Sequence, residues 1–261
     1  MSTQFNNSQS YLVKWDTRYR ISGTASNAVL PIVGNSIYIS RIEVVQLEMF
    51  NSWYAANPLN YVIDFDDGGG PVQAIIQPGN YNRINFPAMV KLAMEAVSAT
   101  TFTVSIDQAS GRLTILGTAP FNLLFATGAL SPPPTSKSYT IDKMLGFARA
   151  DTGFAAAQVG AFPVNLSGEN YIYFTSSLVN GRDNAIIAAG NTDIAASGNG
   201  IFHMAQIFTT QASVTETNTS YKQVYVGATT TNFDVQVRYN DGNIVDLNGF
   251  DYSMLVRIYF A

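Results

Sequence analysis

The sequence predicts an all-β protein built from antiparallel strands. Runs of alternating apolar and polar residues recur along the chain, glycine and Asn/Asp turn signals separate them, and one segment reads clearly as a helix. The chain of 261 residues is long enough to bury a sizeable core, and β-sandwiches or barrels of this size commonly form one domain. One elaborated β domain is therefore expected.

The first long strand is predicted between Ser36 and Phe50. Its apolar residues change face twice, in the order Ile37 and Ile39, then Ile42 and Val44, then Val45, Leu47 and Met49. Such a slip indicates either a β-bulge or a long strand buried on both sides. The N-terminal residues 1–20 precede it and are predicted to be a polar arm, because they begin with an Asn/Ser/Gln-rich tail.

The middle of the chain predicts a strand, a helix and a hairpin. Residues 59–65 alternate with a period of two and end at Asp66, Asp67 and three glycines. A helix is predicted from its N-cap Asn85 to Thr100 or Thr101, because Pro87 suits the first turn and apolar residues recur at helical spacing. Residues 102–106 and 113–115 flank a turn at Gly111, which predicts a hairpin.

Two more strands are predicted near the C-terminus. Residues 233–239 alternate ahead of Asp241 and Gly242, a strong tight-turn signal. Residues 254–260 form an apolar run that we expect to be paired inside a sheet. Residues 128–138, with three successive prolines, are expected to be a connecting loop on the surface.

The composition indicates a largely neutral surface. Charged residues make up 12% of the chain, about half of the roughly 25% in an ordinary soluble domain, and uncharged faces suit burial against partners. The net charge is −4 without a run of Lys or Arg, so direct nucleic-acid binding is not expected. No apolar stretch approaches the roughly 20 residues of a membrane span, and the absence of cysteine excludes disulfides and thiolate metal sites.

The motifs that could carry chemistry are weak. His203 is the only histidine and lies in an apolar run, where a structural role is the better interpretation. Asp64, Asp66 and Asp67 lack the closing glutamate of a calcium loop and are interpreted as a solvated strand end. Gly68 to Gly70 lack the Gly-Lys-Ser/Thr of a phosphate loop. We therefore predict no enzyme activity and no catalytic, cofactor-binding or metal-binding residue, although paired carboxylates distant in the chain stay open.

Several short motifs carry a family resemblance. A Pro78–Tyr81 turn precedes the helix and hairpin, Thr140 and Ile141 precede Leu145–Phe147, Val164–Leu166 precede the strand at 171–174, and Asn240–Gly242 precede the last strand. In order, these features over roughly residues 60–260 resemble the penton and minor capsid proteins of double-jelly-roll double-stranded DNA viruses. Virophages, Polinton-like viruses and large algal viruses are among them.

The resemblance implies a fold and a function. The fold would be a single jelly-roll antiparallel β-sandwich over residues 21–261, with a small helix-plus-hairpin insertion at about 71–138. Five copies would close each vertex of an icosahedral shell as a homopentamer beside the major capsid protein, in virions assembled from protein made in the host cytoplasm or nucleus. The alternatives are a minor or cement capsid protein, a trimeric receptor- or carbohydrate-binding spike head with exposed aromatics, and a β-sandwich hydrolase.

Overall fold

The computed structural model describes residues 9–32, 36–131, 140–179, 200–206, 213–217 and 223–260. The chain divides into two compact units. Unit 1 combines Met1–Trp53 with Glu169–Ala261, and unit 2 is Tyr54–Gly168. Each unit has its own apolar core.

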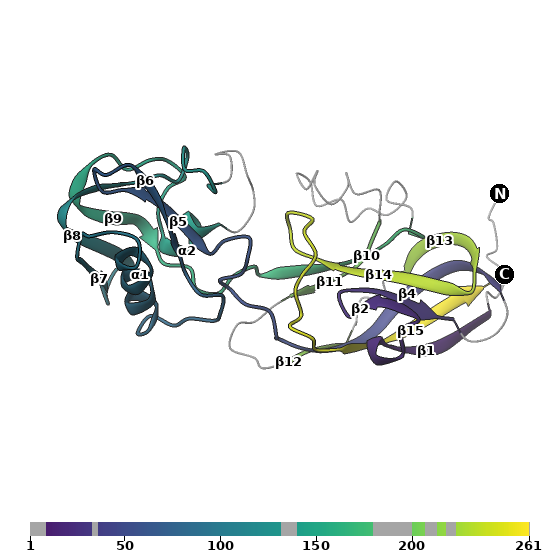
Figure 1. Ribbon diagram of the computed structural model, residues 1–261. Helices are drawn as coiled ribbons and strands as arrows, with labels where there is room; N and C mark the ends of the chain where they lie inside the picture. The colour runs from purple at the N-terminus through teal and green to yellow at the C-terminus, as the bar shows by residue number, and fades with distance from the viewer. Residues whose placement is uncertain are drawn as a thin grey trace, which may run out of the picture. The chain divides into compact units, whose positions relative to one another are not determined.

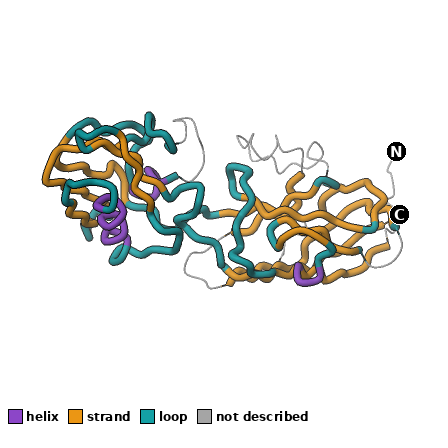
Figure 2. The backbone as a smooth tube through the Cα atoms, viewed as in Figure 1, coloured by secondary structure: helices purple, strands orange, loops and turns teal. Residues whose placement is uncertain are grey.

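Unit 1 is a sandwich of two antiparallel sheets (Figures 1 and 2). One sheet has the order β1-β15-β4-β12, with β13 also paired to β4, and the other has the order β11-β10-β14-β3-β2. The strands are β1 (Gln9–Asp16), β2 (Ser22–Thr24), β3 (Asn27–Pro31), β4 (Ile37–Phe50), β10 (Tyr171–Ser176), β11 (Gly200–Gln206), β12 (Ser213–Thr217), β13 (Gln223–Thr230), β14 (Asn232–Arg238) and β15 (Tyr252–Phe260); a 3-10 turn, η1 (Thr17–Tyr19), follows β1.

The strand order of unit 1 is that of a jelly roll. The described part of unit 1 has eight strands when the short edge strand β2 is set aside and β12 and β13, which pair with consecutive parts of β4, are counted as one. Successive strands of the chain belong to one sheet or the other, and β1 and β15, at the two ends of the described chain, pair with each other. Apolar side chains of both sheets fill the interior, where Trp15 stacks on Phe233 with ring centroids 4.7 Å apart. The predicted fold class is confirmed.

Two bulges explain the changing pattern of β4. Along its pairing with β15, the register skips one β4 residue at Ser40 and another at Val45. Each extra residue reverses the alternation of the side chains. Ile42 and Val44 therefore lie in the same core as Ile39 and Leu47, and the prediction that they face the other side was wrong. The bulge was the correct alternative.

Residues 9–16 of the N-terminal arm predicted at residues 1–20 form a strand, β1. β1 pairs with β15 from Gln9 opposite Phe260 to Asp16 opposite Ser253, so the last strand is paired on both sides, by β1 and by β4. Val13 and Trp15 point into the core while Leu12 is exposed. These two buried side chains anchor the strand in the core. The sequence did not predict it, because the polar residues around them obscure the alternation of apolar and polar side chains.

Unit 2 is a sheet that shares one apolar core with two short helices, α1 and α2 (Figure 1). The side of the sheet that faces this core is called its inner side. Its sheet has the order β6-β5-β8-β7, and β9 pairs with the other edge of β8. The elements are β5 (Val62–Asp66), β6 (Pro71–Ile75), α1 (Phe86–Glu95), β7 (Phe102–Ile106), β8 (Arg112–Leu123), α2 (Ile141–Leu145) and β9 (Ala155–Pro163). The insertion expected at about 71–138 lies within this unit. The unit spans more residues than the expected insertion, because β5, α2 and β9 also belong to it.

The local predictions in unit 2 had mixed outcomes. The hairpin of β7 and β8 is confirmed, with Phe102 opposite Gly117 and Ile106 opposite Leu113. The helix is shorter than expected, because α1 ends at Glu95 and Val97 is 42% exposed. Asn85 does not cap it with its side chain, which accepts a hydrogen bond from the Asn82 backbone instead. Residues 132–138 of the predicted proline loop, 128–138, lie outside the described residues.

Candidate functional site

An open pocket of about 610 Å³ lies in unit 1 where β1 ends, β12 begins and β15 begins. Phe50 and Phe250 line it, with ring centroids 5.6 Å apart, and each ring is about half exposed. Its other lining residues are Lys14, Asp16, Arg18, Glu48, Met49, Ser213, Thr215, Gly249, Asp251, Tyr252 and Ser253. The pocket therefore combines two apolar rings with side chains of both charges.

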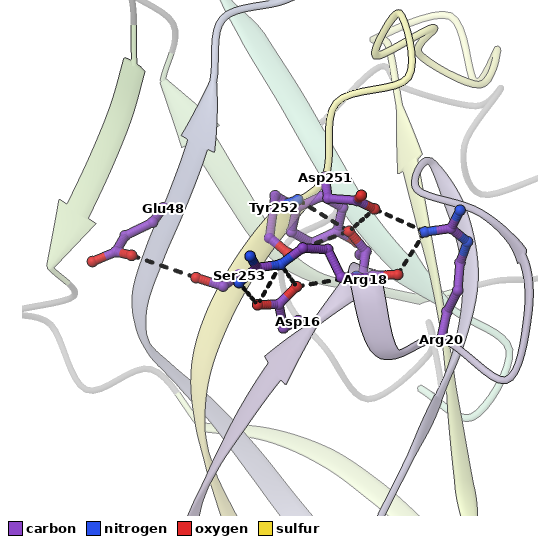
Figure 3. A network of polar contacts seen from close by, with 8 residues as sticks. Asp16, Arg18, Arg20, Glu48, Asp251, Tyr252 and Ser253 are labelled. Atoms are coloured by element: carbon purple, nitrogen blue, oxygen red, sulfur yellow. Dashed lines mark hydrogen bonds and ion pairs between the residues drawn. The ribbon is translucent and has the colours of Figure 1, made fainter.

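A network of polar contacts includes several residues that line this pocket (Figure 3). The buried hydroxyl of Thr17 donates a hydrogen bond of 2.7 Å to Asp251 Oδ1 and accepts one of 3.0 Å from the Tyr252 backbone N–H. Arg20 Nη1 donates to the same Asp251 oxygen at 2.8 Å and to the Thr17 carbonyl at 2.6 Å. These bonds tie η1, at the end of β1, to the first residue of β15.

Asp16 forms the second part of the network. Its carboxylate accepts hydrogen bonds from Arg18 Nε at 2.9 Å and from the Arg18 backbone N–H at 3.0 Å. The Arg18 guanidinium therefore holds the pKa of this carboxyl below its usual range, although partial burial opposes the shift. Arg18 thus pairs with Asp16, and Arg20 pairs with Asp251. Because both carboxylates have a cationic partner, we interpret the network as structural.

The candidate catalytic residue His203 does not line the pocket. It lies on β11, where its Nε2 is 3.1 Å from Glu216 Oε2 on β12, and so it links the two sheets of the sandwich. Its ring also lies 5.7 Å from the ring of Phe174. These contacts fit the structural role predicted for it. Within the described ranges, no three His, Cys, Asp or Glu side chains gather as metal ligands would.

The aspartates in the second half of β5 and just after it differ from the prediction at one position. Asp66 accepts hydrogen bonds from the backbone N–H groups of Gly68 and Gly70 and so shapes the turn of a hairpin. Asp64 is buried rather than solvated, because its side chain points back to a later loop. It accepts bonds from the Leu130 backbone at 2.9 Å and from the Ser131 hydroxyl at 3.1 Å. The interpretation as a solvated strand end was wrong for Asp64.

Unit 2 carries a second candidate site, an exposed sheet surface of mostly uncharged side chains. On the side of β7, β8 and β9 that faces away from α1, the side chains include Thr103, Ser105, Thr114, Leu116, Ala157 and Val159, with the exposed Arg112 beside them on β8. We call these six residues the outer face. Leu116 is 48% exposed and Val159 is 49% exposed. An exposed edge strand with apolar, uncharged side chains readily pairs with or packs on another chain.

Sequence reasoning missed both sites, because each depends on the three-dimensional arrangement of the strands. The pocket joins the ends of β1 and β4 to the starts of β12 and β15, and only the jelly-roll order brings these segments together. The outer face was readable in part, because residues 155–163 contain no charged residue. That signal did not show which of these residues would be exposed.

Comparison with known proteins gave no match by sequence: no family model and no curated protein matches the chain. By structure, the chain is similar to the penton protein of mavirus, solved as a selenomethionine crystal structure. The identity is 7% and the TM-score is 0.48, over 97% of this chain and 100% of that one. At these values the likeness assigns no function. In the described part of the chain, no helix is long and apolar enough to cross a bilayer.

Proposed function

We propose that this protein is a viral structural protein, a penton that closes the vertices of an icosahedral capsid as a homopentamer. The observation that carries the proposal is the jelly-roll strand order of unit 1, an architecture used by viral capsid and lectin domains. The short motifs described above, which resemble those of penton and minor capsid proteins, add to it. In this function the chain acts by assembly and carries out no covalent chemistry.

The outer face supports self-association. A ring forms when one surface of each copy contacts a different surface of the next, and both surfaces are then removed from water. Burying Thr, Ala, Leu and Val side chains avoids the desolvation cost that Lys or Glu would impose. An outer face of hydroxyl and apolar side chains, with a single arginine, Arg112, beside it on β8, fits a subunit interface better than a permanently solvated surface.

The pocket of unit 1 favours one other function, that of a receptor- or carbohydrate-binding head. Two half-exposed rings beside hydroxyl and charged groups suit stacking and hydrogen bonding to a sugar. Such a head would assemble as a trimer. A minor or cement capsid protein would use the same sandwich and differ in its partners.

The oligomeric mass tests these functions. Light scattering across a range of protein and salt concentrations is expected to give five times the 28.3 kDa chain mass, either throughout or on concentration. A trimer would favour the binding head. A persistent monomer would contradict the penton and leave the cement protein or an enzyme. Because the outer face is mostly uncharged, the pentamer is expected to persist in high salt.

A further inference from the structure

Four of the residues that line the pocket of unit 1 form a polar row across one sheet. Asp16 on β1 lies opposite Ser253 on β15, and Ser253 lies opposite Glu48 on β4. Glu48 in turn lies opposite Thr215 on β12. Since neighbouring strands lie about 4.8 Å apart, the row is about 14 Å long. It places hydroxyl and carboxylate groups side by side in the pocket.

The polar row lies on the side of the sheet that faces away from the core. Beside each of its members, the same strand carries a residue that is buried in the core of unit 1: Trp15, Met49, Val214 and Tyr252. Side chains alternate between the two sides of a strand, so the row points outward. Phe50 and Ser213 lie opposite each other, two residues from Glu48 and Thr215, and therefore share this outer side.

Glu48 has acceptor positions to spare. Its Oε1 accepts a hydrogen bond of 2.8 Å from Gln46 Nε2, and its Oε2 accepts a long one of 3.4 Å from the Ser253 hydroxyl (Figure 3). A carboxylate has about four acceptor positions, so about two are unused. The Glu48 side chain is exposed, and within the described ranges it forms no ion pair, whereas Asp16 pairs with Arg18. Two hydroxyl groups of a ligand can therefore donate to it.

Phe50 and Phe250 add an apolar surface beside the polar row. Phe50 is 56% exposed and Phe250 is 49% exposed. Their rings are tilted by 56° to each other, so neither ring covers the whole face of the other. An aromatic face can pack on the C–H groups of a sugar ring, while the hydroxyls at the rim of that sugar reach polar groups nearby.

The charges of the pocket favour an uncharged ligand. Two of its carboxylates already pair with arginines, as described above. Lys14 and Glu48 remain, one cation and one anion, so neither charge is in excess. A phosphate or a carboxylated sugar would be favoured by an excess of cations, and a basic peptide by an excess of anions. The hydroxyls of Ser213, Thr215 and Ser253 instead suit a ligand with many hydroxyl groups.

We propose that this pocket binds an uncharged sugar, which packs on the rings of Phe50 and Phe250 and donates two hydroxyl hydrogen bonds to Glu48. The pocket volume of about 610 Å³ lies in the range of small-molecule sites, about 300–1,000 Å³. Because the pocket is open, the sugar can be the end of a longer glycan. The inference rests on the binding function given above as the second candidate, and it is compatible with the penton.

Saturation-transfer NMR on the full chain gives the first test. The uncharged probes are glucose, galactose, mannose, fucose and N-acetylglucosamine, and the charged probe is N-acetylneuraminic acid. At least one uncharged sugar is expected to receive saturation, most strongly at the protons of the ring face that packs on the aromatic rings. Transfer to none of the uncharged sugars would overturn the inference. Transfer to N-acetylneuraminic acid alone would overturn it as well, because the ligand would then be an anion.

Phe250→Ala gives the second test. Loss of this ring is expected to weaken binding of the responding sugar about tenfold. Phe162→Ala, at a ring that is 58% exposed in unit 2, is the matched control and is expected to bind the sugar like the parent. Equal weakening by both variants, or unchanged binding by Phe250→Ala, would show that the sugar does not lie in this pocket.

Glu48→Gln gives the third test and does not depend on the aromatic rings. It keeps the size of the side chain but replaces one acceptor oxygen by an amide donor, so binding is expected to weaken about tenfold. Because Glu48 is exposed, the melting temperature is expected to match that of the parent, which separates lost binding from lost folding. Full binding by this variant would contradict the assigned role of Glu48.

Light scattering of the same samples separates this inference from the penton. If the parent is a pentamer that binds none of the uncharged sugars, the inference is wrong while the penton stands. If the parent binds a sugar in this pocket but is a trimer or a monomer, the inference stands and the penton is wrong. Phe250→Ala and Glu48→Gln are expected to keep the oligomeric mass of the parent.

Discussion

The Tyr259 hydroxyl donates a 2.8 Å hydrogen bond to Glu43 Oε2 on the sheet of β1, β15 and β4, where the Glu43 side chain is 1% exposed. Arg257 Nη1 is 3.3 Å from the same oxygen. Glu43 Oε1 is buried without a hydrogen-bond partner among the described residues. The carboxylate is thus held by contacts to one oxygen, and Tyr259 provides the shorter of the two.

Tyr259→Phe is therefore expected to destabilise the protein by about 1–2 kcal/mol, because it removes a donor from a buried carboxylate. Urea unfolding measures the change. Tyr38→Phe, at a tyrosine that is 40% exposed on the neighbouring strand β4, is the control and is expected to change stability by less than about 0.5 kcal/mol. Equal effects of the two substitutions would show that Tyr259 does not stabilise Glu43.

Gly146→Ala is expected to cost about 3 kcal/mol or more. Gly146 ends α2 at a φ of 78°, and an added Cβ would lie 2.3 Å from the Phe162 carbonyl oxygen on β9. Gly153 has a similar φ of 74° but no atom within 4 Å of such a Cβ. Gly153→Ala isolates the backbone strain, about 1 kcal/mol.

Thermal unfolding compares the two glycine variants. The Gly146 variant is expected to melt well below the Gly153 variant, because only it must displace β9 from α2. Similar melting temperatures would mean that the close approach of Gly146 to Phe162 does not constrain the unit.

Sequence reasoning located the strands that bury one side and leave the other side partly accessible to solvent. In β14, Phe233, Val235 and Val237 are all fully buried, while the residues between them are only partly buried, so the pattern predicted the strand. The pattern of β4 changed phase where bulges insert Ser40 and Val45. Its prediction as a single strand succeeded because a bulge explains a slip without ending the strand.

Short elements anchored by few side chains escaped prediction. α2 has only five residues, and its hold on the core depends on Met144 and Leu145 together with the hydrogen bond between Arg149 and the buried Asp142. Such contacts form only after distant segments meet. For the same reason the network of Thr17 and Asp251 could not be read from residues 234 positions apart.

Val256→Asp is expected to prevent folding or to cost about 3 kcal/mol or more, because it buries a charge without a partner. Val256 is 0% exposed at the centre of β15, between β1 and β4. Val237→Asp on β14, in the opposite sheet, is expected to act in the same way. Soluble yield and thermal melting report the effect. Leu12→Asp, at a residue 53% exposed on β1, is the control and is expected to be nearly neutral.

Asp16→Asn is expected to lower stability at pH 7 by about 1 kcal/mol, a small value because solvent screens the exposed Arg18. Hydrogen bonding to Arg18 lowers the pKa of Asp16 in the folded state below the roughly 3.9 of an unfolded aspartate. The carboxylate therefore adds stability above about pH 4, which is lost as pH falls through the lower folded pKa. Urea unfolding of parent and variant from pH 7 to pH 2 is expected to show a gap that closes in acid. A gap that stays constant with pH would mean that the charge of Asp16 does not contribute to the stability of the fold.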